Sequence, residues 1–134
     1  MTGEKIFYLT EEGLGKIKRE LKYLEELKGD LSFSESRLHE LEHILKNSKL
    51  IEPPLKVKQN TVYLGATILV SVDGQEDEFT LVGHLEANPS LGRISNESPV
   101  GMALLGHRAG DRVVISSPVK TIYKIKKIKY ERTA

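Results

Sequence analysis

The chain has 134 residues, 20 Lys and Arg against 19 Asp and Glu, 39% apolar residues and no cysteine. This composition predicts one folded domain, or a small domain with an appendage, and it excludes disulfides, thiol catalysis and cysteine-bound metals. The net charge of +1 argues against a protein that binds nucleic acid by a large basic excess, and the lack of any long apolar run predicts a cytoplasmic protein without membrane contact.

The first apolar pattern of the chain has helical spacing. Its members are Leu14, Ile17, Leu21, Leu24 and Leu27. Thr10 stands at the position of an N-cap, and Glu11 and Glu12 place negative charge in the first turn, where the helix dipole favours it. Gly29 follows the pattern as the residue expected to end the helix.

A second helix is predicted after a loop of about three residues, which is short enough to require that the two helices run antiparallel. Ser32 and Glu35 form a capping box at its start. Its apolar stripe consists of Leu38, Leu41 and Leu45. We therefore expect a helical hairpin from Thr10 to about Ile51, with an arm of roughly 28 Å. Such an arm buries little apolar surface, which predicts a monomer or weak self-association.

Pro53-Pro54 ends the helical part, because proline cannot continue a helix. The rest has β-type sequence with strong turn signals. Strands are expected over 61–72, 78–83, 94–95, 112–116 and 121–130, with a turn at Asp73-Gly74, a short helix over 100–105 and a bulge near Lys126-Lys127. The sequence thus predicts an α+β protein, with the hairpin in residues 1–52 and a small, mostly antiparallel sheet in residues 53–134.

Several short motifs occur in both parts of the chain. They are Leu9-Thr-Glu-Glu-Gly13, Lys16, Glu20-Leu21, Leu81-Val-Gly83, Glu86-Ala87, Gly92-Arg-Ile-Ser-Asn-Glu-Ser-Pro99, Ala103-Leu-Leu-Gly106 and Gly110-Asp111. In this order, and after a helical hairpin, these motifs resemble the Gre family of bacterial transcription elongation factors.

The resemblance implies a fold and a mode of action for each part. The second part is expected to be FKBP-like and to dock on bacterial RNA polymerase at the secondary channel. The docking residues that the resemblance implies are Asn96, Glu97, Ser98, Pro99, Leu104 and Leu105. The hairpin is expected to reach along the channel, where acidic residues at its tip help the polymerase to hold a second Mg²⁺ and to cleave backtracked RNA. The protein would then be no enzyme, would hold no cofactor of its own and would meet nascent RNA only indirectly.

The hairpin departs from the family pattern at its tip. Asp30 matches the first tip acid, and the resemblance assigns it the assisting role at the Mg²⁺ of the polymerase. Phe33 stands where the second acid belongs, and Glu35 is explained by capping. Because the two-metal mechanism needs more than one carboxylate, a short arm with one acid predicts weakened or lost cleavage. The alternative is a non-cleaving channel binder, similar to the Rnk proteins or engineered by shortening.

Three other patterns have competing interpretations. His39-Glu-Leu-Glu-His43 matches the zinc-protease pattern, but no third ligand follows it, so we favour a solvated helix face over a zinc hydrolase. An FKBP-like fold allows a prolyl isomerase, which the few aromatic residues disfavour. A lysine-rich last strand indicates a protected sheet edge, which we favour, or a weak contact with a nucleic-acid backbone. Its lysines are Lys120, Lys124, Lys126, Lys127 and Lys129.

Overall fold

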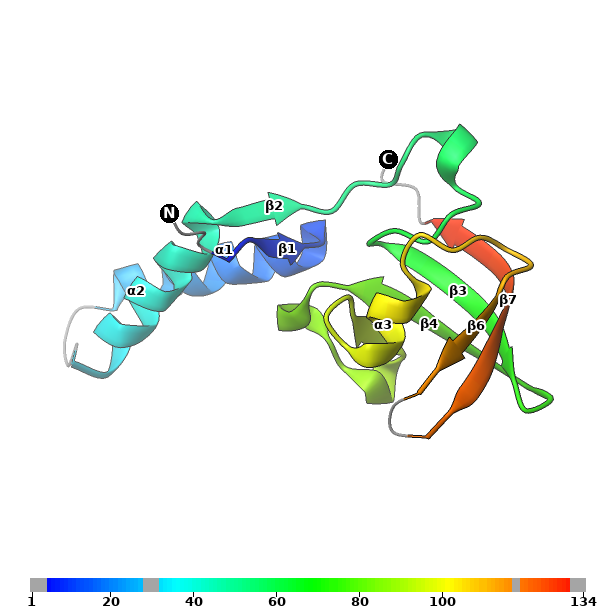
Figure 1. Ribbon diagram of the computed structural model, residues 1–134. Coiled ribbons are helices and arrows are strands. Elements are labelled where there is room, and N and C mark those ends of the chain that lie inside the picture. The colour runs from blue at the N-terminus through cyan, green and yellow to red at the C-terminus, as the bar shows by residue number, and fades with distance from the viewer. Residues whose placement is uncertain (1–4, 28–31, 117–118, 131–134) are drawn as a thin grey trace. The chain divides into compact units, whose positions relative to one another are not determined.

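The computed structural model describes residues 5–27, 32–116 and 119–130, with side chains described from residue 35 onward in the second range. The chain divides into two compact units, Met1–Leu50 and Ile51–Ala134 (Figure 1). The first is mainly helical and the second is built on a mostly antiparallel sheet, which confirms the predicted α+β class. In the part of the chain that is described, no helix is long and apolar enough to span a membrane.

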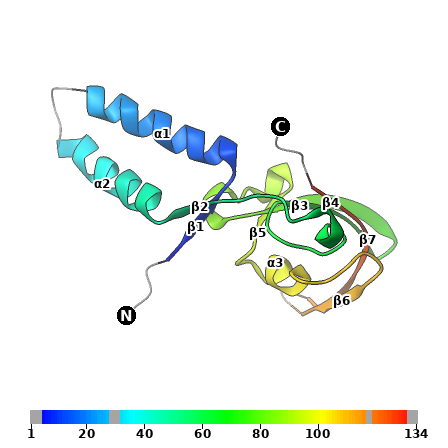
Figure 2. The same ribbon diagram turned by 90° about the horizontal axis from the view of Figure 1, so that it is seen from above.

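The first unit is a short helical hairpin whose two ends are joined by a pair of strands (Figure 2). Helix α1 covers Glu11–Glu26 and helix α2 covers Ser32–Lys46. Strands β1 (Phe7–Leu9) and β2 (Ser48–Leu50) pair in parallel, with the whole hairpin as the connection between them. The hairpin is therefore confirmed, although the 16 residues of α1 span only about 24 Å.

Local signals at the start of the hairpin act as predicted. The hydroxyl of Thr10 accepts a hydrogen bond from the backbone N–H of Gly13 at 3.1 Å and caps α1. Gly29, expected to end this helix, lies outside the described residues. Helix α2 already includes Ser32, and because the side chain of Ser32 is not described, the capping box stays a prediction.

The hairpin unit was expected to extend to about Ile51, and its second helix ends five residues earlier. Helix α2 ends at Lys46, where Asn47 donates from its backbone to the carbonyl of His43 at 3.1 Å and from its side chain to the same carbonyl at 2.8 Å. The next residues leave the helix because they pair with β1, and Phe7 N–H donates to the Asn47 carbonyl at 2.9 Å. A three-residue parallel strand has no periodicity that distinguishes it from a helix end.

The second unit is a five-stranded sheet in the order β5-β4-β3-β7-β6. Within this sheet, β4 and β5 pair in parallel, and the other described pairs of strands are antiparallel. The strands are β3 (Ala66–Val72), β4 (Gln75–Val82), β5 (Arg93–Ser95), β6 (Arg112–Ile115) and β7 (Thr121–Tyr130), and the other elements are α3 (Pro99–Leu104) and the 3-10 turns Lys56–Lys58, His84–Glu86 and Pro89–Leu91. One face of this sheet forms the core with α3, and its fully buried members include Ile68, Leu81, Leu104 and Ile125.

Two predicted backbone features of the sheet are confirmed. Asp73 and Gly74 both have positive φ, 51° and 80°, as a two-residue turn of type I′ between β3 and β4 requires. The register of β7 shifts so that Leu69 faces Lys127 while Val70 faces Ile125. Lys126 is therefore the extra residue of a β-bulge.

The interpretation of the lysine-rich strand as a sheet edge is wrong for residues 121–125, the first half of β7, and agrees with the second half, which contains Lys126, Lys127 and Lys129. Strand β7 lies between β3 and β6, and β6 pairs with residues 121–124 of it (Figure 1). The backbone of Ile125 adds hydrogen bonds to Gly110 and Asp111 on the same side. Only beyond Ile125 is no second partner strand described. Sequence alone does not show that the last strand inserts between earlier ones.

The end of β7 is tied to the segment that enters the sheet. The hydroxyl of Tyr130 donates to the carbonyl of Thr61 and accepts from the backbone N–H of Tyr63 at 2.9 Å. Burial raises the pKa of the Tyr130 phenol, so it stays a hydrogen-bond donor across the physiological range. One hydroxyl thus serves two backbone groups that are distant in sequence.

Replacing Tyr130 by Phe leaves those two backbone groups without their partner, and we expect the free energy of unfolding to fall by about 1–2 kcal/mol. Urea unfolding followed by circular dichroism measures this. Tyr123→Phe is the matched control, because no hydrogen bond of that hydroxyl is described and its removal should be nearly neutral. Equal effects of the two substitutions would contradict the role of Tyr130.

Candidate functional site

The loop between β5 and α3 contains three of the predicted docking residues, Asn96, Glu97 and Ser98, and its backbone is held at each step. Asn96 donates its N–H to the carbonyl of Val82 at 3.0 Å, and Glu97 donates to the hydroxyl of Ser95 at 2.9 Å. The side-chain oxygen of Asn96 is buried and has no donor within the described part of the chain. Backbone contacts, rather than this side chain, therefore fix the loop.

Ser98 and Pro99 begin helix α3. The hydroxyl of Ser98 donates to the carbonyl of Ser95 at 2.6 Å and accepts from the N–H of Gly101 at 3.1 Å, which makes Ser98 the N-cap. Pro99 occupies the first helical position, where its fixed φ suits the helix and its missing N–H costs nothing. This pair of residues is thus explained by the local fold, whatever else it contacts.

Gly101 of helix α3 is a structural residue of this site that the sequence analysis missed. A Cβ atom at this position would lie 2.0 Å from the carbonyl oxygen of Ser95. Only glycine allows α3 to pack this closely on the end of β5. A glycine inside a predicted helix, which normally weakens it, was the available signal.

The side chains of this region divide into buried and exposed ones. Leu104 is fully buried in the core, so its side chain does not lie on the surface of this region. Leu105 is exposed, and so is Met102, which is 59% accessible and was not predicted. Pro99 and Glu97 are exposed as well. We call Glu97, Pro99, Met102 and Leu105 the α3 surface; three of the four are apolar.

An acidic group at the edge of the α3 surface faces a histidine. The Nδ1 atom of His84 lies 3.8 Å from Oε2 of Glu97, a contact between two segments that the sequence did not relate. The pair connects the 3-10 turn His84–Glu86 to the loop before α3. The α3 surface therefore combines a rigid apolar centre with a charged rim.

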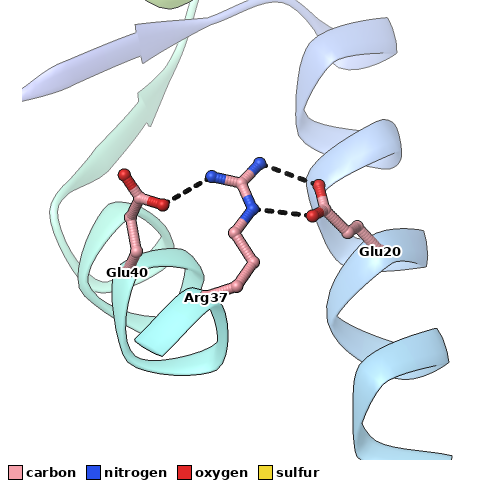
Figure 3. A network of polar contacts seen from close by, with 3 residues as sticks. All are labelled: Glu20, Arg37 and Glu40. Atoms are coloured by element: carbon pink, nitrogen blue, oxygen red, sulfur yellow. Dashed lines mark hydrogen bonds and ion pairs between the residues drawn. The ribbon is translucent and has the colours of Figure 1, made fainter. Parts of the chain in front are cut away.

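The hairpin was predicted to act through Asp30, which lies outside the described residues. What the structure describes is the contact that joins the two helices, shown in Figure 3. Arg37 of α2 donates from Nε to Glu20 of α1 at 2.6 Å and from Nη2 to the same carboxylate at 2.9 Å. Its Nη1 donates to Glu40 at 2.6 Å. A bidentate pair of this kind fixes geometry as well as charge, so it sets the register of the hairpin.

These contacts shift the protonation equilibria of their members. The hydrogen bonds from Arg37 lower the pKa of the Glu20 carboxyl, and the carboxylates of Glu20 and Glu40 raise the pKa of the Arg37 guanidinium. Both Glu20 and Arg37 side chains are about 40% exposed (40% and 42%), which limits the energy of the pair through solvent screening.

The histidine pattern on α2 does not assemble a metal centre. Within the described ranges, no group of three or more histidine or acidic side chains is placed to hold a metal ion. The ring of His43 packs edge-on against Phe7 at 5.9 Å, and the largely exposed His39 lies 3.9 Å from Glu42. Both histidines therefore make contacts that are ordinary for side chains on the outside of a helix.

Comparison with known proteins places this chain among transcription factors. A family model described as the C-terminal part of transcription elongation factor GreA/GreB matches residues 57–130. Transcription elongation factor GreA of Thermomicrobium roseum is 50% identical over 95 residues, which span 71% of this chain but only 61% of that protein. GreA of Geobacillus kaustophilus is 36% identical over 147 residues, covering 88% of this chain and 92% of that protein.

A solved structure shares the fold. The GreA/GreB factor from Nitrosomonas europaea superposes with a TM-score of 0.51 at 23% sequence identity, over 95% of this chain and 100% of that one. The alignment to the Geobacillus protein also carries information on length. It spans 147 positions, more than the 134 residues of this chain, so the relative has residues to which nothing here corresponds.

We expect Arg37→Gln to lower the stability of the hairpin by about 0.5–1 kcal/mol, because it removes both ion pairs of a half-exposed cluster. The contribution of Glu20 is present above the ordinary glutamate pKa of about 4.3 and is lost as the pH falls through its lowered native value. The measurement is urea unfolding of the helical signal at neutral and acidic pH, where the difference between wild type and variant should shrink in acid.

Arg19→Gln is the control for this prediction, since it removes the same charge from an exposed site on α1. A loss in Arg19→Gln as large as in Arg37→Gln, or a difference that does not depend on pH, would show that the cluster does not set the stability of the hairpin.

Proposed function

The chain belongs to the GreA/GreB family of transcription elongation factors, and we propose that it binds bacterial RNA polymerase at the secondary channel and modulates elongation there. Membership rests on the family match over residues 57–130 and on 36% identity across 88% of the chain, and it confirms the resemblance found in the motifs. As a member of this family, the protein is an accessory factor to the polymerase and not an enzyme. We place its action in the cytoplasm, as a monomer or weakly self-associating protein.

The α3 surface is the docking site in this proposal. Its centre is apolar and exposed, so a partner that covers it removes apolar surface from water. The charge of Glu97 at its rim can orient the partner during association. The loop and helix beneath it are held by backbone bonds and by the close contact at Gly101. A surface that is ordered before binding loses little entropy on association.

The length of the hairpin supports a limited role for the arm. Helix α1 spans only about 24 Å, and the Geobacillus relative contains residues that this chain lacks. We propose that these missing residues belong to the arm, in line with the departure from the family pattern at the tip, where Phe33 stands in place of the second acid. With Asp30 as the one acid retained near the tip, support for Mg²⁺-dependent cleavage is weakened or lost. A channel occupant similar to the Rnk proteins is the alternative that this arm favours.

Docking is tested by Met102→Glu, which places a charge at the centre of the α3 surface. We expect the affinity for RNA polymerase to fall at least tenfold, because a buried unpaired carboxylate costs more than about 1.4 kcal/mol at an interface. Binding of the labelled protein to core polymerase measures it. Val57→Glu is the control, since Val57 is an apolar residue of the same unit that is 83% exposed. If Met102→Glu bound the polymerase as tightly as the wild type, the docking site would not be the α3 surface.

The role of the arm is tested in a backtracked elongation complex with saturating protein and Mg²⁺. We expect little acceleration of RNA cleavage, the same rate with Asp30→Ala, and protection of the RNA from an added GreA with a full-length arm. Acceleration that requires Asp30 would show instead that a short arm with one acid is sufficient for cleavage.

A further inference from the structure

The face of the sheet that points away from the core has an uneven charge. Along β7, residues that face the core alternate with exposed ones, and the bulge at Lys126 makes two successive lysines exposed. The exposed residues of β7 and its neighbour β6 are Ile122, Lys124, Lys126, Lys127, Lys129, Arg112 and Val114. This surface carries five cations and no acid, and acids enter the face only from β4.

Two of the five cations are neutralised across the sheet. The Nζ atom of Lys126 lies 3.3 Å from Oε2 of Glu76, and that of Lys129 lies 3.5 Å from Oε2 of Glu78. Both acids belong to β4, on the far side of β3 (Figure 1). These pairs are ordinary surface ion pairs and are consistent with a purely structural role.

Arg112, Lys124 and Lys127 have no such partner among the residues that the structure describes. All three are exposed. Arg112 and Lys124 are also direct neighbours in the β6–β7 register, where two like charges repel each other. The sheet gains no stability from this arrangement, which points to a ligand that compensates the charge.

The spacing of the free cations fits an extended polyanion. Lys124 faces Ser71 and Lys127 faces Leu69, so the two lysines stand two ladder positions apart, about 6.7 Å along the strand. Arg112 adds a third charge beside the first. None of the exposed residues of β6 and β7 is aromatic, so this face offers no platform on which bases would stack. Contacts are therefore expected with phosphates rather than with bases.

We propose that Arg112, Lys124 and Lys127 form a binding surface for the phosphate backbone of single-stranded RNA, separate from the α3 surface. A single row of cations along one strand follows one nucleic-acid strand. The choice of RNA rests on the proposed function, because an elongation factor works beside a nascent transcript. The binding surface itself rests on charge and register alone.

The test uses the full chain and a fluorescently labelled 20-residue uridine oligonucleotide, with binding measured by fluorescence polarisation. We expect the logarithm of the affinity to fall with the logarithm of the salt concentration with a slope of about −2, as about three phosphate contacts to a single strand predict. A thymidine DNA oligonucleotide should bind no more tightly than the RNA.

Lys124→Glu separates binding from folding. It should weaken RNA binding about tenfold, since one attraction becomes a repulsion, yet it should stabilise the sheet because the introduced carboxylate would face Arg112. The control is Lys58→Glu, an identical charge change at an exposed position of the 3-10 turn Lys56–Lys58. It should leave the affinity within about twofold of the wild type, because screening limits distant charges.

Several results would overturn the proposal. They are the absence of salt-dependent binding, equal losses in Lys124→Glu and Lys58→Glu, tighter binding of DNA, and competition by polyglutamate as strong as that by unlabelled RNA, which would indicate an acidic polypeptide instead. Met102→Glu should bind RNA like the wild type. Failure of the RNA surface and failure of polymerase docking are therefore measured independently.

Discussion

The pairing of β7 with β3 is the constraint on which the second unit depends. It joins residues 66–72 to residues 123–130, far apart in the chain, and Tyr130 extends the connection to Thr61 and Tyr63. Strand β6 is held to the sheet only through β7, and β4 and β5 follow on the other side of β3. Because this contact is so distant in sequence, closing it costs chain entropy that the buried side chains of the central strands must offset.

The bulge in β7 reconciles two demands on one strand. Ile125, Ile128 and Tyr130 must all pack against the core, yet strict alternation would place Ile125 and Ile128 on opposite faces. The extra residue at Lys126 shifts the alternation by one position, so that Ile125 and Ile128 both face the core. A bulge of this kind was predictable from sequence because the apolar residues change parity within a continuous strand. The same signal could not reveal the strand's neighbours, since parity describes one strand and the sheet order depends on contacts between distant ones.

In the rest of the fold, too, local features could be predicted from the sequence and contacts between distant segments could not. Features that depend on one or two residues, such as the Thr10 cap and the Asp73-Gly74 turn, were predictable because the residue type determines the local backbone. The parallel pair of β1 and β2 could not be predicted, because a strand of three residues is too short to show the alternation of apolar and polar residues that identifies a strand. The candidate site shows the same limit. Leu104 and Leu105 are neighbours of the same residue type, and only the packing of α3 shows which of them is buried.

The two units of this protein are under different physical demands. The sheet unit has an extensive core, and its α3 surface is supported by contacts at Ser95 and Gly101 that do not involve the hairpin. The hairpin has few fully buried side chains, and its register depends on the half-exposed cluster around Arg37. A change in hairpin length therefore leaves the α3 surface intact. Because a surface cluster gives little energy for each added turn, a short arm also costs the fold little. The sheet unit can therefore keep its structure and its α3 surface while the length of the hairpin varies.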